Sequence, residues 1–226
     1  MKVSVPRETF SMLINNNIAM ERLVNEFDLS SLQAKQFAHY VDLVEAWTLR
    51  KNLVSKKDRS RIVDKHIFES LEIVKHKLIA GTGRLLDVGS GAGFPGLPLA
   101  IMYPELHVVL AESKRMRALF LREAVEQVRL SNTTVVCERV EKLGGVFVCD
   151  YVSARAVASL ADLWRWSYPL LKPDGILIAL KGGQVDAEIN ELLRYDKLSC
   201  KIISFCGKET EKKIVVLSQH ELSNIT

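Results

Sequence analysis

The sequence predicts an α/β fold in which a seven-stranded, largely parallel sheet follows an N-terminal helical extension. Beyond residue 81, short apolar runs alternate with amphipathic stretches, which is the pattern of βαβ units. Before that point, apolar residues recur at the spacing of helices. We therefore divide the chain into a helical extension, residues 1–80, and an α/β domain, residues 81–226.

The extension is predicted from two amphipathic stretches. Apolar side chains recur at helical spacing in residues 31–49, and residues 62–78 repeat the pattern. Neither stretch shows the sustained heptads of a coiled coil, so a monomer is the expected state.

A glycine-rich segment opens the α/β domain. Residues 85–101, LLDVGSGAGFPGLPLAI, combine an apolar strand, a glycine turn and an apolar helix, a junction that lays a nucleotide-like cofactor against the backbone. After Asp87, Gly89, Gly91 and Gly93 form G-x-G-x-G, which is typical of S-adenosylmethionine (SAM) methyltransferases. From Gly91 the same stretch also spells G-x-G-x-x-G, the dinucleotide fingerprint. The pattern favours SAM and leaves open a nicotinamide or flavin site, or a purely structural turn.

A second acid supports a cofactor site without identifying the cofactor. Glu112 directly follows the apolar run 107–111 and lies 23 positions after Gly89. A carboxylate at this place takes both ribose hydroxyls of a bound cofactor. Both classes of cofactor use such a carboxylate.

The remaining predicted strands and helices favour one of the two classes of cofactor. Apolar runs of strand length cover residues 85–88, 107–111, 133–137, 150–154, 176–181, 201–206 and 213–218. Helical patterns cover 114–128, 160–171 and 185–193, and Pro173-Asp174-Gly175 marks a break before the fifth run. The last two runs leave no room for a helix between them, which predicts a β-hairpin after five parallel strands. This is the Rossmann-like architecture of the class I SAM-dependent methyltransferase, whereas a dinucleotide-binding fold normally continues its βα alternation.

The composition predicts one substantial core in a cytoplasmic protein. Of 226 residues 48% are hydrophobic, yet no apolar run approaches the roughly 20 residues that cross a bilayer. The four cysteines form no C-x-x-C pair and lie at no zinc spacing from a histidine, so neither a metal site nor a disulfide framework is indicated. We expect each cysteine to be buried, and Trp47, Trp164 and Trp166 to pack in the interior.

Positive charge is concentrated in one segment, although the formal net charge is only +4. Residues 50–66 hold seven lysines and arginines against Asp58 and Asp64. Such a block beside a catalytic domain is the electrostatic footprint of a polyanionic substrate. A solvated surface without a partner is the alternative.

The sequence lacks the residues that several other classes of methyltransferase require. The run 150–154 and Arg155 do not carry the Asn/Asp-Pro-Pro-aromatic motif that methylation of an adenine amine requires. No cysteine follows a proline, the common context of the nucleophile in C5-pyrimidine enzymes. Lys181 beside Asp150 remains a candidate pair for ribose 2′-O transfer. A regulatory module that binds a nucleotide without turnover is the alternative outside enzymes.

Several sequence blocks make this chain resemble one bacterial family. The strongest is DVGSGAGFPGLPLAI at 87–101, because Phe94-Pro95-Gly96 is a narrower signature than the glycines alone. Further blocks are SKRMRALFL at 113–121, ERVE at 138–141, SARA at 153–156, ALKG at 179–182, Lys51-Asn52-Leu53, and KHIFESL at 65–71. Over most of its length the chain is similar to the small-subunit ribosomal RNA methyltransferase G family, also called glucose-inhibited division protein B.

The chain departs from that family at a few positions. Val54 stands where the family has threonine, Glu69 stands where it has aspartate, and the last strand reads EKKIVVLS without the family's arginine. These departures concern substrate contacts more than the cofactor site.

The resemblance implies SAM as methyl donor and 7-methylguanosine in the decoding-region hairpin of 16S ribosomal RNA as product. The expected partner is therefore 16S rRNA or the 30S subunit. Guanine N7 carries a lone pair and no proton, so its methylation needs no general base. The resemblance also implies cofactor contacts from Gly89, Phe94, Val140, Glu141 and Arg155, which join Asp87, Gly91, Gly93 and Glu112 of the glycine segment and second acid.

The carboxyl edge of the predicted sheet, where ligands bind, carries Glu141, Arg155 and Lys181. We expect Arg155 to meet the methionine carboxylate or an RNA phosphate, unless it forms a surface ion pair. Glu141 is expected near the adenine, and Lys181 near RNA. The RNA-contact candidates are Lys51, Asn52, Lys56, Lys57, Arg59, Arg61, His66 and Lys181, with His66 either stacked on a base or buried.

Overall fold

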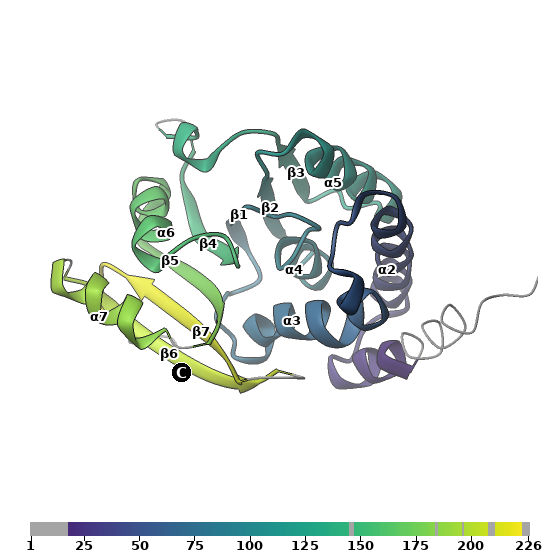
Figure 1. The fold of residues 1–226 in the computed structure, drawn as a ribbon, viewed down its shortest axis with the longest axis horizontal. Coiled ribbons are helices and arrows are strands. Elements are labelled where there is room, and N and C mark those ends of the chain that lie inside the picture. Colours follow the sequence, from purple (N-terminus) through teal and green to yellow (C-terminus); the bar gives the residue numbers. More distant parts are fainter. Residues whose placement is uncertain (1–17, 145–146, 184, 196, 208–210, 223–226) are drawn as a thin grey trace, which may run out of the picture.

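A computed structural model describes residues 18–222 except 145–146, 184, 196 and 208–210, and contains a seven-stranded sheet with helices on both faces (Figure 1). The strand order is β3-β2-β1-β4-β5-β7-β6. The strands are β1 (Gly83–Val88), β2 (Leu106–Ala111), β3 (Thr133–Val136), β4 (Cys149–Arg155), β5 (Leu171–Gly182), β6 (Ser199–Cys206) and β7 (Glu211–Ser218).

The strand directions confirm the predicted architecture. β1 to β5 pair in parallel, and β7 runs antiparallel between β5 and β6. β1 and β4 are neighbours, with Val88 opposite Ala154. Because parallel strands end at one edge, the segments that follow β1, β2, β3 and β4 meet at the carboxyl edge of the sheet.

One strand boundary differs from the prediction. Pro173-Asp174-Gly175 does not precede β5 but lies inside it, since β5 begins at Leu171. Cys149 pairs with Leu171, and the next paired residues are Tyr151 and Ile176, so β5 carries extra residues at this point. A bulge absorbs residues that would otherwise end a strand.

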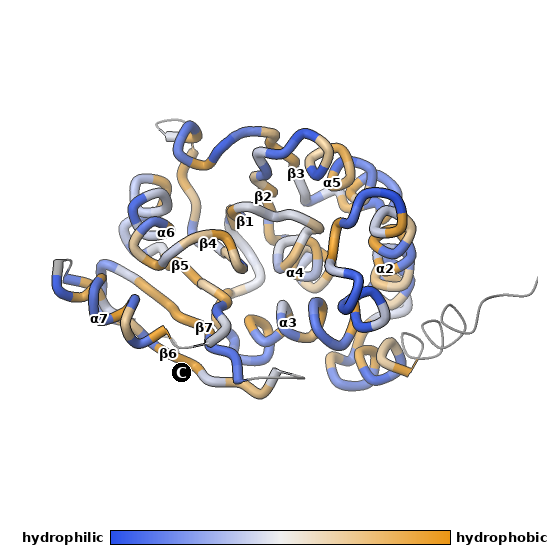
Figure 2. Tube along the Cα trace, in the orientation of Figure 1, coloured by the Kyte–Doolittle hydropathy of each residue, from blue (hydrophilic) through white to orange (hydrophobic). Residues whose placement is uncertain are grey.

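Helices cover the sheet in two layers. On one face lie α4 (Gly96–Met102) and α5 (Arg115–Val128), and on the other lie α6 (Leu160–Ser167) and α7 (Asp186–Tyr195). Figure 2 shows apolar strands inside and mixed hydropathy along the outer helices, as expected for helices that bury one face. In the described part of the chain, no helix is both long and apolar enough to cross a membrane.

The extension packs on the α4 and α5 side. It comprises a helix over residues 18–26, α2 (Ser31–Lys51), a 3-10 turn η1 (Lys56–Arg61), a π-helical turn η2 (Ile62–Ile67) and α3 (Phe68–Lys75). The helix predicted for residues 62–78 is confirmed over residues 62–75, with π-helical geometry in η2 and α-helical geometry in α3. Ser30 and Gln33 form a capping box at the start of α2, and Asn52 in a left-handed conformation ends it.

The extension and the sheet share one hydrophobic core. Phe37 and Val44 of α2 and Ile67 of η2 are fully buried in the same cluster as Leu110 of β2 and Phe120 of α5. Trp47 contacts Phe120 edge-on, with ring centroids 5.5 Å apart. Because these apolar faces cover each other, the extension is expected to unfold together with the sheet.

A substitution in α2 tests this shared core. Phe37→Ala is expected to lower the free energy of unfolding by about 3–5 kcal/mol, because it leaves a cavity between α2 and the α/β domain. Urea unfolding followed by circular dichroism and by tryptophan fluorescence should give one common transition. The control is Leu32→Ala on the same helix, since Leu32 is 66% exposed. Two separate transitions, or equal effects of the two variants, would contradict a shared core.

Candidate functional site

The glycine loop leaves β1 and is fixed to the end of β2. The N–H groups of Gly89 and Ser90 donate to the Ala111 carbonyl, at 2.8 and 3.2 Å. Gly89 has φ +64°, and a Cβ placed on it would lie 2.8 Å from the Val157 side chain. Gly93 has φ +95°, and its Cβ would meet Leu97. Glycine is required at both positions because a side chain would strain the loop and fill the space beside it.

Glu112 holds the middle of this loop. Its carboxylate accepts the Gly91 N–H at 3.0 Å and the Lys114 N–H at 2.7 Å, and the residue is only 4% exposed. Each carboxylate oxygen has a second lone pair that can accept a ribose hydroxyl. The structure therefore gives Glu112 a loop-fixing role that the sequence reasoning did not include.

Asp87 lies behind the loop and does not line the hollow beside it. It is fully buried, and its Oδ1 accepts the Ser153 hydroxyl of β4 at 2.8 Å. Burial raises the pKa of Asp87 to about 6, against the lowering effect of its hydrogen bonds. The prediction of a direct cofactor contact is corrected to a supporting role, because the carboxylate joins β1 to β4 in the interior.

A hollow of about 220 Å³ follows the carboxyl edge of the sheet from β3 to β4. Residues after β3 form one end, the ends of β2 and β1 form the floor, and Val157 after β4 with Trp166 of α6 forms the other end. The lining residues are Val88, Gly89, Ala111, Ser113, Glu138, Arg139, Val140, Glu141, Val157 and Trp166. Gly89, Val140 and Glu141 were predicted as cofactor contacts, and the structure brings them together here.

The hollow is suited to a flat ring joined to a polar chain. Val140, Val157 and Trp166 supply apolar walls, and Glu141 supplies a carboxylate at the β3 end, 3.9 Å from Arg139. Sequence reasoning missed Ser113, Val157 and Trp166. Trp166 of α6 lies beside the glycine loop. Helical periodicity within α6 does not predict this position, because it depends on β4 being the neighbour of β1 in the sheet.

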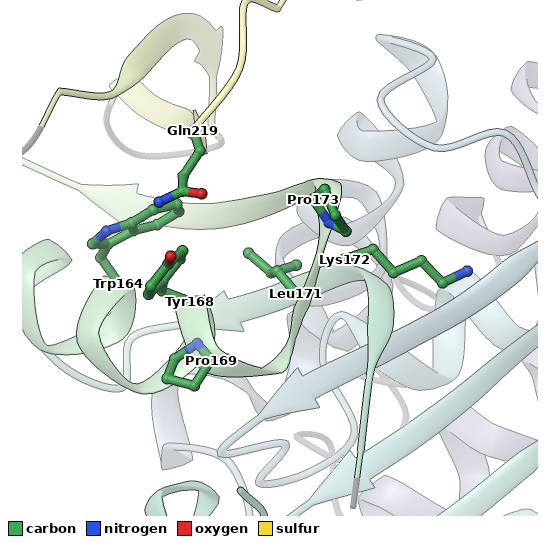
Figure 3. A pocket seen from close by; sticks show the side chains of 8 residues that line it. Trp164, Tyr168, Pro169, Leu171, Lys172, Pro173 and Gln219 are labelled. Atoms are coloured by element: carbon green, nitrogen blue, oxygen red, sulfur yellow. The ribbon is translucent and has the colours of Figure 1, made fainter. Parts of the chain in front are cut away.

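Other hollows lie away from the glycine loop. One, of about 310 Å³, lies at the amino end of β5 (Figure 3). It is lined by Trp164, Tyr168, Pro169, Leu171, Lys172, Pro173, Gly175 and Gln219. Trp164 is buried, as predicted, and stacks on Tyr168 with centroids 5.7 Å apart. Another hollow, of about 370 Å³, lies between α3 and the end of β6. The smaller hollow is the candidate cofactor site because it alone of these follows β1 and the glycine loop.

Arg155 ends β4 and joins the α/β domain to the extension. Its Nη2 lies 2.9 Å from Glu69 Oε2 of α3 and 2.6 Å from His66 Nδ1 of η2, and its Nη1 donates to the His66 carbonyl at 3.4 Å. The Arg155 and Glu69 side chains are 13% and 8% exposed. The alternative of a surface ion pair is therefore corrected: the pair is buried, because the extension covers this end of β4.

Phe94 packs against His66 and lies near the Arg155 guanidinium. Its ring stacks on the His66 ring with centroids 5.0 Å apart, and the Arg155 guanidinium carbon lies 5.8 Å from the Phe94 centroid. Tyr40 of α2 packs on Phe94 and donates its hydroxyl to the Ala92 carbonyl at 2.6 Å. The end of the glycine loop is thus held by side chains of the extension.

His66 is largely buried and neutral, which confirms the buried alternative expected from the sequence and not stacking on an RNA base. Burial and the nearby Arg155 cation lower the pKa of His66 to about 3. Since Arg155 can only donate, His66 Nδ1 accepts and the ring proton lies on Nε2. Asp58 Oδ2 lies 3.9 Å from Nε2.

The basic block divides into exposed and inward-facing residues. Lys51, Asn52, Lys56 and Lys57 are exposed, and Arg59 is half-buried.

The inward-facing cations of the block form ion pairs with Asp58. It accepts from Arg61 at 3.0 Å and from Lys65 at 2.7 Å, and Ser55 also donates to it. Although burial raises the pKa of Asp58, the hydrogen bonds from Lys65 and Ser55 lower it to about 2. Arg61 is therefore a partner of Asp58 in this structure, and its role as an RNA contact stays a prediction.

Lys181 forms hydrogen bonds in the interior and lies far from Asp150. Its Nζ donates to the Ala158 carbonyl and to Glu188, both at 2.8 Å, and its side chain is 12% exposed. Asp150 is the second residue of β4 and pairs with Lys172 at 2.6 Å. Tyr151 is opposite Ile176, so Lys181 is roughly 16 Å further along the strand. The pairing of Lys181 with Asp150 is wrong, because the two lie at opposite edges of the sheet.

The cysteines differ from one another in exposure. Cys149 is buried, as predicted, and burial raises the pKa of its thiol to about 12. Cys137 and Cys206 are exposed, which corrects the expectation that all four are buried. Within the described residues, no group of three or more His, Cys, Asp or Glu side chains is arranged to hold a metal ion.

Sequence comparisons point to one family. A family model described as rRNA small subunit methyltransferase G matches residues 33–215. The chain is 41% identical over 152 residues to ribosomal RNA small subunit methyltransferase G of Chlorobaculum tepidum, covering 67% of this chain and 70% of that protein. It is 34% identical over 206 residues to the protein of the same name from Vibrio cholerae serotype O1, covering 89% of this chain and 97% of that protein.

Structural comparisons support the fold. A cofactor-bound structure of Rv0187 from MTB matches with a TM-score of 0.59 and 16% identity, over 83% of this chain and 90% of that chain. The ribosomal protein L11 methylase of Lactobacillus delbrueckii subsp. bulgaricus matches with a TM-score of 0.55 and 13% identity, over 67% of this chain and 77% of that chain. At these identities the matches establish the class I methyltransferase fold.

The buried His66 predicts a pH-dependent contribution to stability. Its pKa falls from 6.5 unfolded to about 3 folded, so the unfolded chain binds the proton first and stability falls as pH decreases below about 6.5. We expect the difference in free energy of unfolding between wild type and His66→Gln to shrink by about 2 kcal/mol between pH 6.5 and 4.5. Urea unfolding of both proteins measures it. Asp87 titrates in both proteins and cancels; a difference independent of pH would contradict a neutral His66.

Proposed function

The chain belongs to the rRNA small subunit methyltransferase G family, and on this premise we propose that it transfers a methyl group from SAM to N7 of a guanine in the decoding-region hairpin of 16S rRNA. The protein is a SAM-dependent methyltransferase by family and by fold. The observation that carries the proposal is the hollow that follows the carboxyl edge from β3 to β4 beside the glycine loop.

The residues around this hollow fit the proposed methyl donor. A Cβ on Gly89 would reach the Val157 side chain and fill the space along the loop. Val140 and Glu141 at the β3 end suit an adenine, because they offer an apolar surface and an acceptor for its amine. Glu112 at the end of β2 has acceptor capacity for ribose hydroxyls. The remaining part of an extended ligand then lies toward Val157 and the end of β4.

The proposed chemistry requires alignment more than proton transfer. When bound, SAM supplies an electrophilic methyl group on a sulfonium. The chain holds the loop by backbone hydrogen bonds from Gly89 and Gly91, which fixes the floor of the site before a ligand arrives. Such preorganised alignment is worth up to about 7–11 kcal/mol in a displacement reaction. Guanine N7 has a free lone pair, so no side chain needs to remove a proton.

The alternatives are less well supported. Ribose 2′-O transfer would use Lys181 and Asp150, which lie at opposite edges of the sheet. A regulatory module without turnover remains the alternative from another class, and it differs by binding SAM without methylating RNA.

We propose that the exposed cations near the glycine loop contact the RNA backbone. Gln36 of α2 donates to the Val128 carbonyl of α5, whereas Trp47 contacts Phe120, so the two helices run antiparallel. The last turn of α2 and the first turn of α5 therefore lie at one end of the molecule (Figure 1). The exposed cations gathered there are Arg50, Lys51, Lys56, Lys57, Lys114 and Arg115. We also propose that the protein acts as a cytoplasmic monomer on 16S rRNA or the 30S subunit.

Methyl incorporation tests the function. We expect radiolabelled methyl groups from SAM to enter 30S subunits that lack this modification, with nucleoside analysis placing the label in 7-methylguanosine. Label in a 2′-O-methyl nucleoside would contradict the N7 assignment. SAM binding without label in free 16S rRNA, precursor particles or 30S subunits would favour the regulatory module.

Glu112 is predicted to act on cofactor affinity. Glu112→Gln should weaken binding of S-adenosylhomocysteine about tenfold or more, because the amide cannot accept both the Gly91 and the Lys114 N–H and loses the carboxylate for the ribose. Isothermal titration calorimetry measures this affinity. The matched control is Glu126→Gln on the exposed face of α5. Unchanged affinity in Glu112→Gln would remove Glu112 from the site.

The exposed lysines of η1 are predicted to act on RNA affinity. Lys56→Ala combined with Lys57→Ala should weaken 30S binding and lower the slope of log K against log salt by about one to two, because up to two phosphate contacts are lost. Filter binding at several salt concentrations measures the slope. Lys35→Ala, at the other end of α2, is the control. Equal slopes for wild type and the double variant would place the RNA elsewhere.

A further inference from the structure

We infer that Glu69, on helix α3 of the extension, is a positioning residue for Arg155 and thereby sets the affinity for the amino-acid end of SAM. This inference rests on the proposed function, since it concerns the same cofactor. It assigns the extension a part in the cofactor site in addition to any RNA contact.

The order of strands places the amino-acid end beside β4. The hollow begins at Val140 and Glu141 after β3, passes Ala111 and Gly89, and reaches Val157 after β4. With the adenine at the β3 end and the ribose at Glu112, the methionine part extends toward β4. The methionine carboxylate therefore needs a cation near the end of β4.

Arg155 is the cation next to that end, although it is not among the residues that line the hollow. It is the last residue of β4 and precedes Val157 by two positions, with Ala156 between them in a left-handed conformation at φ +53°. Its guanidinium lies 5.8 Å from the ring of Phe94, the residue that ends the glycine loop. A guanidinium has five N–H donors, so it can hold partners in the extension and still donate to a ligand carboxylate.

Glu69 and His66 fix the guanidinium from the side of the extension. Glu69 Oε2 lies 2.9 Å from Nη2, and His66 offers both its ring Nδ1 and its carbonyl. Glu69 is 7% exposed and Arg155 is similarly buried, so neither partner is screened by bulk water. The neutral His66 adds no charge, which leaves Glu69 as the carboxylate that orients the cation. A first contact to a ligand is precise only when its supporting residues are fixed.

A pair of ligands isolates this effect. S-adenosylhomocysteine carries the amino-acid carboxylate, whereas 5′-methylthioadenosine has the same adenosine and thioether but lacks that part. We expect Glu69→Gln to weaken S-adenosylhomocysteine binding about tenfold or more and to leave 5′-methylthioadenosine binding within about twofold. Glu69→Asp keeps the charge and should recover most of the lost affinity. Calorimetry measures all affinities without turnover.

The control is Glu72→Gln, one turn further along α3. Glu72 pairs with Lys75 at 3.6 Å and His76 at 3.4 Å, so its loss should change neither affinity. Thermal unfolding establishes that each variant is folded. If Glu69→Gln does not fold, His66→Ala removes the ring contact to Arg155 and leaves the backbone carbonyl contact, and it should show the same ligand selectivity.

The outcomes separate the inference from the proposed function. Equal weakening for both ligands would overturn the inference, because a purely structural role of Glu69 disturbs the adenosine part as well. Unchanged binding of both ligands by Glu69→Gln would also overturn it. A wild-type protein that binds neither ligand would contradict the proposed function itself.

Discussion

The structure depends on the conformation of one loop with few side chains, the glycine loop between β1 and α4. Gly89 and Ser90 donate to Ala111, and Gly91 donates to Glu112, so the end of β2 fixes the first half of the loop. Tyr40 and His66 fix the second half from the extension, through the Ala92 carbonyl and the Phe94 ring. A loop with so few side chains of its own takes its shape from its neighbours.

That constraint is a reason to expect the extension and the sheet to fold as one unit. The extension buries Phe37 and Ile67 in the core of the sheet, and it also carries the two residues that hold Arg155. Removing it would expose this apolar surface to water and would take away Glu69 and His66, the partners of Arg155. The same helices also present exposed lysines at their outer end, so the proposed RNA contacts would share one scaffold with the support of the loop.

The fold was predictable because its signals are local. Apolar runs, the glycine segment and the missing helix before residue 213 define strands, loop and hairpin without tertiary information. Single side chains were less predictable. The basic segment gave no sign that Arg61 turns to Asp58, and the residues around Lys181 gave no sign that it reaches Glu188. Trp166 followed a helical pattern like that of an interior residue, yet it lines the hollow. Which partner a charged group chooses depends on elements distant in sequence, and a single sequence does not specify those distances.

The position of β7 has a consequence for the synthesis of the chain. β7 is the last strand to leave the ribosome, yet it lies between β5 and β6, and Ile214 and Val216 enter the core that also holds the first helices. Residues 211–218 must be synthesised before β5 and β6 can both be paired, so the nascent chain exposes an unpaired edge of β5 from residue 182 until that point. Such an edge is prone to pair with other chains. A pause in translation between β5 and β7 is therefore more hazardous for a protein of this topology than a pause before β5.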